Sequence, residues 1–310
     1  MKIIRAEYLG MCFGVRDAIT LALKQAEVAP LTVLGDLVHN ESVLATLRAK
    51  GVTIEQHADK VSTPTVMVTA HGASERALNR TRALGLNVLE ATCPLVHLAH
   101  RAVHGLVREG FHPVIIGKRD HVEVRGLTDD LKEYDVVLEE EDIANLREHP
   151  RLGVVSQTTQ PIEKVHRLVE LIRARFPRSD VKFQDTVCQP TKQRQSAAIE
   201  LAQECELVVV VGGPKSNNTR ELVRTCERFC PRVHYVQNAG DLRSEWFEGI
   251  SLVGLTAGTS TPDVTIDAVE HRIRCLNSVP AEASEAISST CDSAAPVLAS
   301  ARRSANGVAA

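Results

Sequence analysis

The sequence of 310 residues contains few aromatic side chains, which make up only 3% of it. Proteins that bind single-stranded nucleic acid stack the bases on aromatic rings, so this scarcity argues against that class. The formal net charge of −3 is close to neutral and provides no basic field for a duplex either. We therefore expect no nucleic-acid partner.

Long apolar runs are also lacking. No segment approaches the roughly 18 consecutive apolar residues of a membrane-spanning helix, and residues 1–7 contain no apolar signal core. We therefore expect a cytoplasmic protein that does not associate with membranes. Neither a GxxxxGK[ST] loop nor a GxGxxG loop is present, so the sequence gives little indication of nucleotide binding.

Eight cysteines are present, and in a cytoplasmic chain they do not indicate a disulfide framework. Three of them, Cys12, Cys93 and Cys188, are separated by 81 and 95 residues, a long period that suggests a repeated unit. A cysteine is most often a small buried apolar residue. Here each lies beside turn or helix-start residues, and three thiolates brought together could hold an iron–sulfur cluster with one iron open for chemistry.

Other candidate metal ligands have simpler explanations. Helical spacing predicts that Cys226 and Cys230 face one apolar core, and no further ligand lies nearby in the sequence. Cys205 and Cys275 are interpreted as packing residues. A helical stripe of three histidines could bind zinc, but a partly exposed helix face explains it equally well; its members are His97, His100 and His104.

Short β-branched runs alternate with helix-like segments, which predicts an α/β fold with parallel strands. The expected strands are residues 31–36, 65–69, 113–117, 153–156, 207–211 and 252–255. Two strands fall in each cysteine interval, so we expect three pseudo-repeated α/β units. Their predicted bounds are 13–93, 94–187, and 188–278 together with 1–12. The Ala/Ser-rich residues 279–310, which include Cys291, are expected to form a disordered tail.

The loops that follow these strands carry polar side chains. Three histidines, His39, His71 and His121, each follow an apolar run, and ligands of open α/β sheets bind beyond the carboxyl ends of strands. Imidazoles gathered there favour an anion site. Glu123 is a candidate acid–base group, although an exposed carboxylate would look the same. The Ser-Asn-Asn-Thr sequence at 216–219 opens a helix, where it can cradle phosphate or act as a simple N-cap.

Nine motifs, in order, resemble those of the 4-hydroxy-3-methylbut-2-enyl diphosphate reductase family (LytB type). They lie at residues 12–15, 38–40, 70–72, 91–96, 117–124, 156–159, 185–188, 216–219 and 256–263. The resemblance implies a trefoil of three α/β units around a central [4Fe–4S] cluster. It implies that Cys12, Cys93 and Cys188 are the cluster ligands, that Thr158 holds the substrate hydroxyl and that Glu123 delivers protons. The implied diphosphate pocket consists of His39, His71, His121, Ser216, Asn217, Asn218 and Ser260. Val122 stands where the family generally has proline.

The implied reaction is reductive dehydroxylation of 4-hydroxy-3-methylbut-2-enyl diphosphate to isopentenyl and dimethylallyl diphosphate, the last step of the non-mevalonate isoprenoid route. No flavin or nicotinamide motif is visible, so an external one-electron donor such as ferredoxin or flavodoxin is expected, with a monomer as the functional unit.

Two alternatives remain open. An iron–sulfur lyase of quinolinate-synthase-like architecture would use a similar cluster, but a dicarboxylate substrate would more typically recruit arginine. A diverged paralogue acting as an iron–sulfur sensor would need a partner surface, and the sequence shows no DNA-binding motif.

Overall fold

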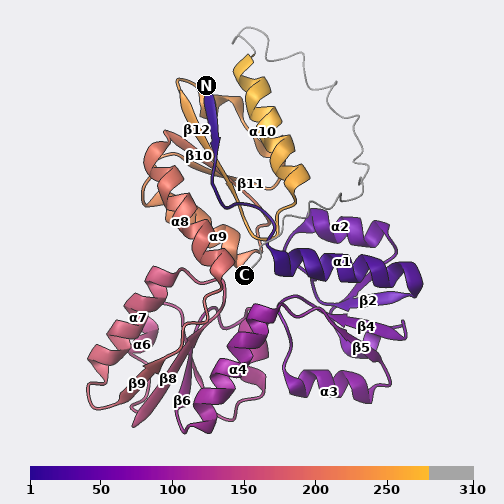
Figure 1. The fold of residues 1–310 in the computed structure, drawn as a ribbon, viewed down its shortest axis with the longest axis vertical. Coiled ribbons are helices and arrows are strands. Elements are labelled where there is room, and N and C mark those ends of the chain that lie inside the picture. Colours follow the sequence, from indigo (N-terminus) through magenta and orange to yellow (C-terminus); the bar gives the residue numbers. More distant parts are fainter. Residues whose placement is uncertain (279–310) are drawn as a thin grey trace, which may run out of the picture.

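The computed structural model describes residues 1–278, which form three four-stranded parallel β-sheets arranged as the three lobes of a trefoil (Figure 1). The first sheet has the order β3 (Thr53–Glu55), β2 (Leu31–Leu34), β4 (Thr65–Val68), β5 (Asn87–Glu90). The second has the order β7 (Asp135–Val137), β6 (His112–Ile116), β8 (Arg151–Ser156), β9 (Asp180–Phe183). The third has the order β1 (Lys2–Arg5), β12 (Leu252–Ala257), β10 (Leu207–Val211), β11 (Val233–Val236). This confirms the predicted α/β trefoil.

All six predicted strands are present, and they are the central pair of each sheet: β2 and β4, β6 and β8, β10 and β12. The expectation of two strands per unit was wrong, because each sheet has a further strand on either edge. These six edge strands have three or four residues each. They are partly exposed and carry polar side chains, so they lack the apolar runs that reveal a central strand.

The helices connect successive strands and cover the faces of the sheets (Figure 1). They are α1 (Phe13–Val28), α2 (Glu41–Ala49), α3 (Glu75–Ala83), α4 (Pro94–Arg108), α5 (Val122–Asp129), α6 (Glu140–Ile143), α7 (Ile162–Arg175), α8 (Gln189–Glu204), α9 (Asn217–Glu227) and α10 (Asp263–Ser278). Short 3₁₀ turns lie at Ala58–Lys60, Ala239–Asp241 and Ser244–Phe247.

Central strands are buried on both faces, because successive side chains point to opposite sides of a sheet. In β6, Val114 and Ile116 pack in a core with α7, whereas Ile115 packs in a separate core with α4. In β10, Val209 and Val211 face the core that contains α10, and the alternate residues face α8 and α9. The carboxyl ends of these rigid strands form the platform on which the site is built.

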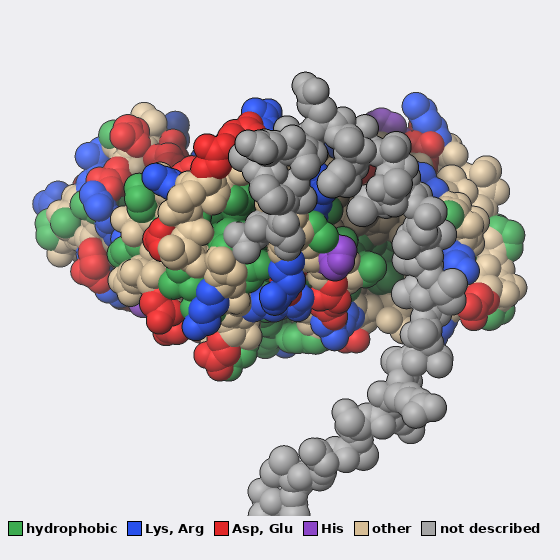
Figure 2. Space-filling view, turned by 90° about the horizontal axis from the view of Figure 1, so that it is seen from above, with side chains coloured by type: hydrophobic (Ala, Val, Ile, Leu, Met, Phe, Trp, Pro, Cys, Tyr) green, Lys and Arg blue, Asp and Glu red, His purple; other side chains and the backbone are tan. Residues whose placement is uncertain are grey.

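The surface carries intermixed charge. Figure 2 shows basic and acidic side chains side by side over the visible face. Several of them form local ion pairs, such as Arg5 with Asp267 at 2.7 Å and Lys182 with Glu109 at 2.6 Å. None of the helices in residues 1–278 has the length and apolarity needed to cross a membrane. The predicted tail, residues 279–310 with Cys291, lies outside the described residues.

Candidate active site

Three cysteines lie where the chain crosses from one sheet to the next. Cys12 follows β1 of the third sheet and is the N-cap of α1, which packs on the first sheet. Cys93 follows β5 of the first sheet and caps α4, which packs on the second sheet. Cys188 follows β9 of the second sheet and caps α8, which packs on the third. The three crossings therefore place equivalent thiols around the centre of the trefoil.

The backbone repeats the same hydrogen bond at each cysteine. The amide N–H of Cys12 donates to the Thr259 carbonyl at 3.0 Å, that of Cys93 to Ala70 at 3.1 Å, and that of Cys188 to Thr158 at 3.0 Å. Each acceptor lies just beyond the carboxyl end of a central strand, which is β12, β4 and β8 respectively. The thiols are thus held to the loops that carry the predicted substrate residues.

The thiols lie near enough to interact electrostatically, because Cys12 acts on the pKa of both Cys93 and Cys188. A Cβ placed on Gly14 would come within 2.5 Å of Cys93 Sγ, so this glycine lets α1 approach the second cysteine. Cys188 Sγ lies 3.1 Å from Thr191 Oγ1. Burial, with a smaller contribution from the neighbouring Cys12, raises the pKa of Cys93 and raises that of Cys188 to about 11. Iron would displace these protons, because metal ions bind the thiolate form. Three converging thiols at three helix N-termini therefore fit an anionic iron–sulfur cluster.

Arg194 anchors the loop that precedes Cys12. Its Nε and Nη2 donate to the Gly10 carbonyl at 3.0 and 2.7 Å, across 184 residues of sequence. The guanidinium is buried and feels the charges of Cys12 and Cys188. Sequence reasoning did not select this residue, because its partner is a backbone carbonyl that becomes a neighbour only in the folded chain.

The three loop histidines form a compact group beside the cysteines. The ring centroids of His39 and His71 are 4.4 Å apart, and those of His121 are 5.3 Å from His39 and 5.5 Å from His71. They come from the loops after β2, β4 and β6, as the sequence predicted. One nitrogen of each ring lies within 4.8 Å of the others, so by distance alone the group could also hold a metal ion.

Burial sets the protonation of this group. It lowers the pKa of His39, lowers that of His71 well below its usual value, and lowers that of His121 to about 3, and mutual repulsion of the rings acts in the same direction in His71 and His121. Nδ1 of both His39 and His71 is buried without a hydrogen-bond partner. An anionic ligand would both satisfy these nitrogens and restore the charged imidazole.

The N-terminus of α9 completes the pocket. Ser216 caps the helix, accepting from Thr219 N–H at 3.2 Å, as its N-cap interpretation required. Asn218 Nδ2 and Ser260 Oγ are buried and have no hydrogen-bond partner, although the Asn218 side-chain oxygen accepts from Thr259 N–H at 3.0 Å. The lining of this cavity, which measures about 40 Å³, consists of Val15, Val38, His39, His71, His121, Thr159, Ser216, Asn217, Asn218, Thr259 and Ser260. Its free donors and helix N-terminus suit phosphate.

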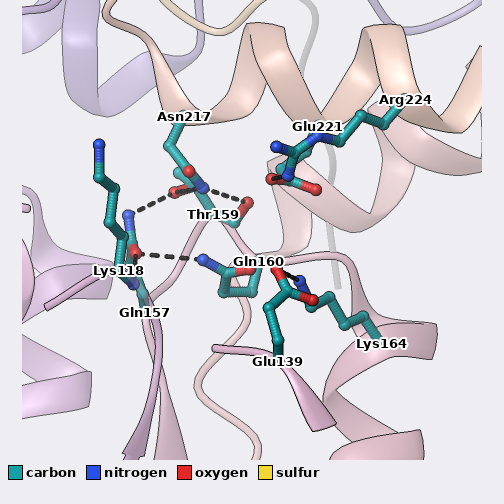
Figure 3. Close-up of polar contacts among 9 residues, drawn as sticks. All are labelled: Lys118, Glu139, Gln157, Thr159, Gln160, Lys164, Asn217, Glu221 and Arg224. Carbon is teal, nitrogen blue, oxygen red and sulfur yellow. Dashed lines mark hydrogen bonds and ion pairs between the residues drawn. The ribbon is translucent and has the colours of Figure 1, made fainter. Parts of the chain in front are cut away.

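A polar network ties this helix to the second sheet (Figure 3). Asn217 Nδ2 donates to the Thr159 carbonyl at 3.2 Å and to its hydroxyl at 3.1 Å. Gln157 Nε2 donates to the same hydroxyl at 3.1 Å, and its oxygen accepts from Gln160 at 3.2 Å and from Lys118 N–H at 3.1 Å. The Ser-Gln-Thr-Thr motif contains Gln157 and Thr159. Their roles were missed because these hydrogen bonds form only when α9 packs beside the loop that follows β8.

Glu123 is buried at the centre of the site with 1% exposure. The N–H of Thr158 donates to its Oε1 at 2.6 Å. Burial raises the pKa of Glu123 to about 7, and the Thr158 backbone and hydroxyl partly offset this. The negative charge of Glu123 also raises the pKa of Cys93 and Cys188, which places the carboxyl group near the thiols. A carboxyl group poised near neutrality is suited to proton transfer.

The remaining sequence candidates lie apart from this centre. Cys226 and Cys230 are buried in one apolar core with Cys205, as predicted, although Cys230 lies beyond the end of α9. The α4 histidines line a separate cavity of about 260 Å³. Three carboxylates from other elements, Glu75, Glu90 and Asp130, line the same cavity.

The fold and the site define an α/β trefoil in which three cysteines at helix N-termini, a buried carboxyl group and a pocket of unpartnered polar atoms lie around one centre. The family model described as LytB protein matches residues 3–274. The chain belongs to this family, as its motifs predicted.

Similar proteins include 4-hydroxy-3-methylbut-2-enyl diphosphate reductases. That of Geobacter metallireducens is 35% identical, covering 90% of this chain and 99% of its own length, and that of Aquifex aeolicus is 37% identical, covering 88% and 96%. One solved structure, described as the terminal enzyme of the non-mevalonate pathway, has 35% identity and a TM-score of 0.65, covering 88% of this chain and 98% of its own. The reductase from Plasmodium falciparum has 25% identity and a TM-score of 0.82, covering 90% and 88%. These relatives favour the reductase over the lyase and sensor alternatives.

Proposed function

We propose that this protein is an iron–sulfur oxidoreductase that converts 4-hydroxy-3-methylbut-2-enyl diphosphate to isopentenyl and dimethylallyl diphosphate, the last step of the non-mevalonate route. The observation that carries the proposal is the convergence of Cys12, Cys93 and Cys188 on the buried carboxyl group of Glu123, next to a pocket of unpartnered donors. A redox centre, a proton donor and an anion clamp are the three parts that this reaction needs.

The diphosphate would bind between the histidine group and the N-terminus of α9. His39, His71 and His121 approach from the first and second sheets, while the Ser-Asn-Asn loop at 216–218 and Ser260 approach from the third. A cavity of about 40 Å³ has room for only a few water molecules. Binding therefore requires the loops to rearrange around the substrate, which would lie among all three units.

The three cysteines would hold one [4Fe–4S] cluster, leaving one iron without a protein ligand. When bound, such a cluster supplies one-electron transfer and a Lewis-acidic iron. We also propose that the three units meet at the cysteines, with bounds of 13–93, 94–187, and 188–278 together with 1–12.

Thr158 and Glu123 would handle the proton at the substrate hydroxyl. The Thr158 hydroxyl orients the substrate oxygen, and the carboxyl group of Glu123 donates a proton to it, so that the oxygen leaves as water. The overall reaction consumes two electrons and two protons, and the second proton adds to carbon at either end of the allyl group, which accounts for two products. The substrate's own diphosphate is the proposed source of this second proton. An external ferredoxin or flavodoxin supplies the electrons to a cytoplasmic monomer.

The direct test is anaerobic turnover of the full-length, cluster-reconstituted protein with 4-hydroxy-3-methylbut-2-enyl diphosphate and a reduced viologen dye. We expect substrate-dependent oxidation of the dye and formation of both five-carbon diphosphates. Cys93→Ser should lose the cluster and the activity, whereas Cys275→Ser, at a partly exposed cysteine on α10, should keep both. An intact cluster that gives no turnover with this substrate would refute the proposed reaction.

A further inference from the structure

A second group of metal-ligating side chains lies at the opposite edge of the second sheet from the site above. His112 and Asp135 are the first residues of β6 and β7, and His149 lies two residues before β8 begins. In the sheet order β7-β6-β8, these are three adjacent strands. Parallel strands share one amino edge, so the fold brings together three side chains that are 23 and 14 residues apart in sequence.

The contacts within the group are short. His112 Nε2 lies 2.9 Å from Asp135 Oδ2, with side-chain exposures of 10% and 32%. The His149 ring stacks on His112, with centroids 3.8 Å apart and planes 5° apart. One ligand atom from each residue lies within 4.8 Å of the other two, which among residues 1–278 is true of only this group and the active-site histidines.

We propose that His112, Asp135 and His149 form a Zn²⁺ site. Two imidazoles and one carboxylate are a ligand set that zinc uses, with water in the fourth position. In a tetrahedral zinc site, ligand atoms about 2.0–2.2 Å from the metal lie a little over 3 Å apart. The His112–Asp135 pair is already near this spacing, so the ion can replace the proton that the two atoms share.

His149 is the ligand that must move. The lone pairs of parallel stacked rings do not point to one place, so its ring has to rotate toward the gap between His112 and Asp135. His112 and Asp135 are held by strands, whereas His149 lies in the connection between α6 and β8 and has more freedom. Glu133 and Arg147 are the other charged groups that act on His149, with opposite signs. The site would link three strands at an edge remote from the reaction.

The test uses the full-length, cluster-loaded protein, freed of loosely bound metal on a chelating resin and titrated anaerobically with Zn²⁺ by calorimetry. The wild type should bind one Zn²⁺ that is lost or weakened more than about tenfold in both His149→Gln and Asp135→Asn. His71→Gln is the matched control, because the active-site histidines could also take zinc. The His71→Gln variant should still bind the Zn²⁺ ion that His149→Gln loses. Reductase activity of His149→Gln should equal that of the wild type.

Thermal unfolding separates zinc binding from a purely structural role of the His112–Asp135 hydrogen bond. Zn²⁺ should raise the unfolding temperature of the wild type and of His71→Gln but not that of His149→Gln. Equal zinc stoichiometry and affinity in the wild type and His149→Gln would overturn the proposal. The proposal would also be overturned if Asp135→Asn were less stable than the wild type but Zn²⁺ raised the unfolding temperature of both proteins equally.

Discussion

At the scale of single residues, the chemistry of the site depends on how burial changes ordinary side chains. Glu123 is almost fully enclosed, and its hydrogen bond from Thr158 offsets only part of the cost of ionisation. The same burial keeps His71 and His121 neutral when no anion is present. One centre therefore holds a carboxyl group that can carry a proton near neutral pH and imidazoles that an anionic ligand would charge.

Replacing the carboxyl group of Glu123 should separate binding from catalysis. Glu123→Gln preserves the shape of the side chain and can still meet Thr158, so we expect normal cluster content. Turnover should fall by about 10²–10⁴-fold, because a positioned proton donor is lost. The measurement is iron content together with dye-coupled activity, and Glu148→Gln, at an exposed position, is the control. Unchanged activity in Glu123→Gln would contradict the proposed role.

The raised pKa of Glu123 predicts a pH dependence. With a pKa of about 7, the carboxyl group is protonated below neutrality and loses its proton above it. Acid catalysis should therefore weaken above pH 7, with kcat/KM falling about tenfold per pH unit. A difference infrared spectrum between the wild type and Glu123→Gln should show a protonated carboxyl band that disappears over the same range. A band that has already vanished at pH 5 would rule out this shift.

The same shift affects stability. The folded-state pKa of Glu123 lies above the usual value of 4.5. Its contribution to stability is therefore fully present below pH 4.5 and is lost as the pH rises through 7. The wild type should therefore lose stability relative to Glu123→Gln as the pH rises from 4.5 to 7, and the difference should level off above that.

Arg194 is expected to support the cysteine loop. Arg194→Gln removes two hydrogen bonds to the Gly10 carbonyl and leaves that buried oxygen poorly satisfied, which should cost about 1–3 kcal/mol. Cluster occupancy should also fall, because the position of Cys12 depends on this loop. Chemical denaturation and iron content measure the two effects. Arg178→Gln, at a side chain that is 85% exposed, should change neither, and full occupancy in Arg194→Gln would refute the supporting role.

At the scale of elements, the same arrangement of strand, cysteine and helix occurs three times. A thiol at a helix N-cap faces free N–H groups and the positive end of the helix dipole, which favours an anionic ligand. The N-termini of α5 and α9 likewise place site residues at the N-cap, which is His121 in α5 and Ser216 in α9. Helix N-termini from all three units thus surround the centre.

Val122 is the first residue of α5 and offers a test of local backbone fit. The preceding His121 has φ −70° and ψ 138°, which is the conformation that a residue before proline adopts. Proline is favoured at the first helical position, so Val122→Pro should stabilise the protein by about 0.4–1 kcal/mol with activity retained. Urea denaturation measures this, with Val122→Ala as the control for the lost side chain. If Val122→Pro were destabilised and Val122→Ala were not, the backbone at His121 would have to differ from the extended conformation described here.

At the scale of the whole molecule, the site exists only where the three sheets meet. The proposed diphosphate pocket draws its residues from every unit, and the cysteines lie at the three crossings between them. Contacts between the loops of different sheets therefore determine the width of the pocket.

Gly213 lies at one such contact between the first and third sheets. A Cβ at this position would come within 2.1 Å of the His39 carbonyl oxygen, which is backbone and cannot move aside. Gly213→Ala should push the two loops apart, costing about 1–3 kcal/mol of stability and raising KM for the substrate. Gly105→Ala is the matched control: it lies within α4 with open space around it, so it should stabilise slightly. Unchanged KM in Gly213→Ala would argue against this contact as a determinant of the pocket.

The fold class, the central strands and the family were all predictable from the order of amino acids alone. Short apolar runs mark the central strands, because central strands of parallel sheets are buried on both faces. The nine motifs are recognisable because each loop carries its own polar residues. The N-cap in the Ser-Asn-Asn-Thr segment was equally predictable, since N-capping is a local interaction between neighbours in sequence.

The edge strands and the partners of distant residues, in contrast, depend on how the chain packs in three dimensions. Short, half-exposed strands such as Asn87–Glu90 are defined by the strand beside them and carry little pattern of their own. The contact of Arg194 with Gly10, and of His112 with Asp135 and His149, joins residues whose separation in sequence gives no sign of their meeting. Secondary structure depends on near neighbours, whereas a site depends on which chain crossings and strand edges the packing brings together.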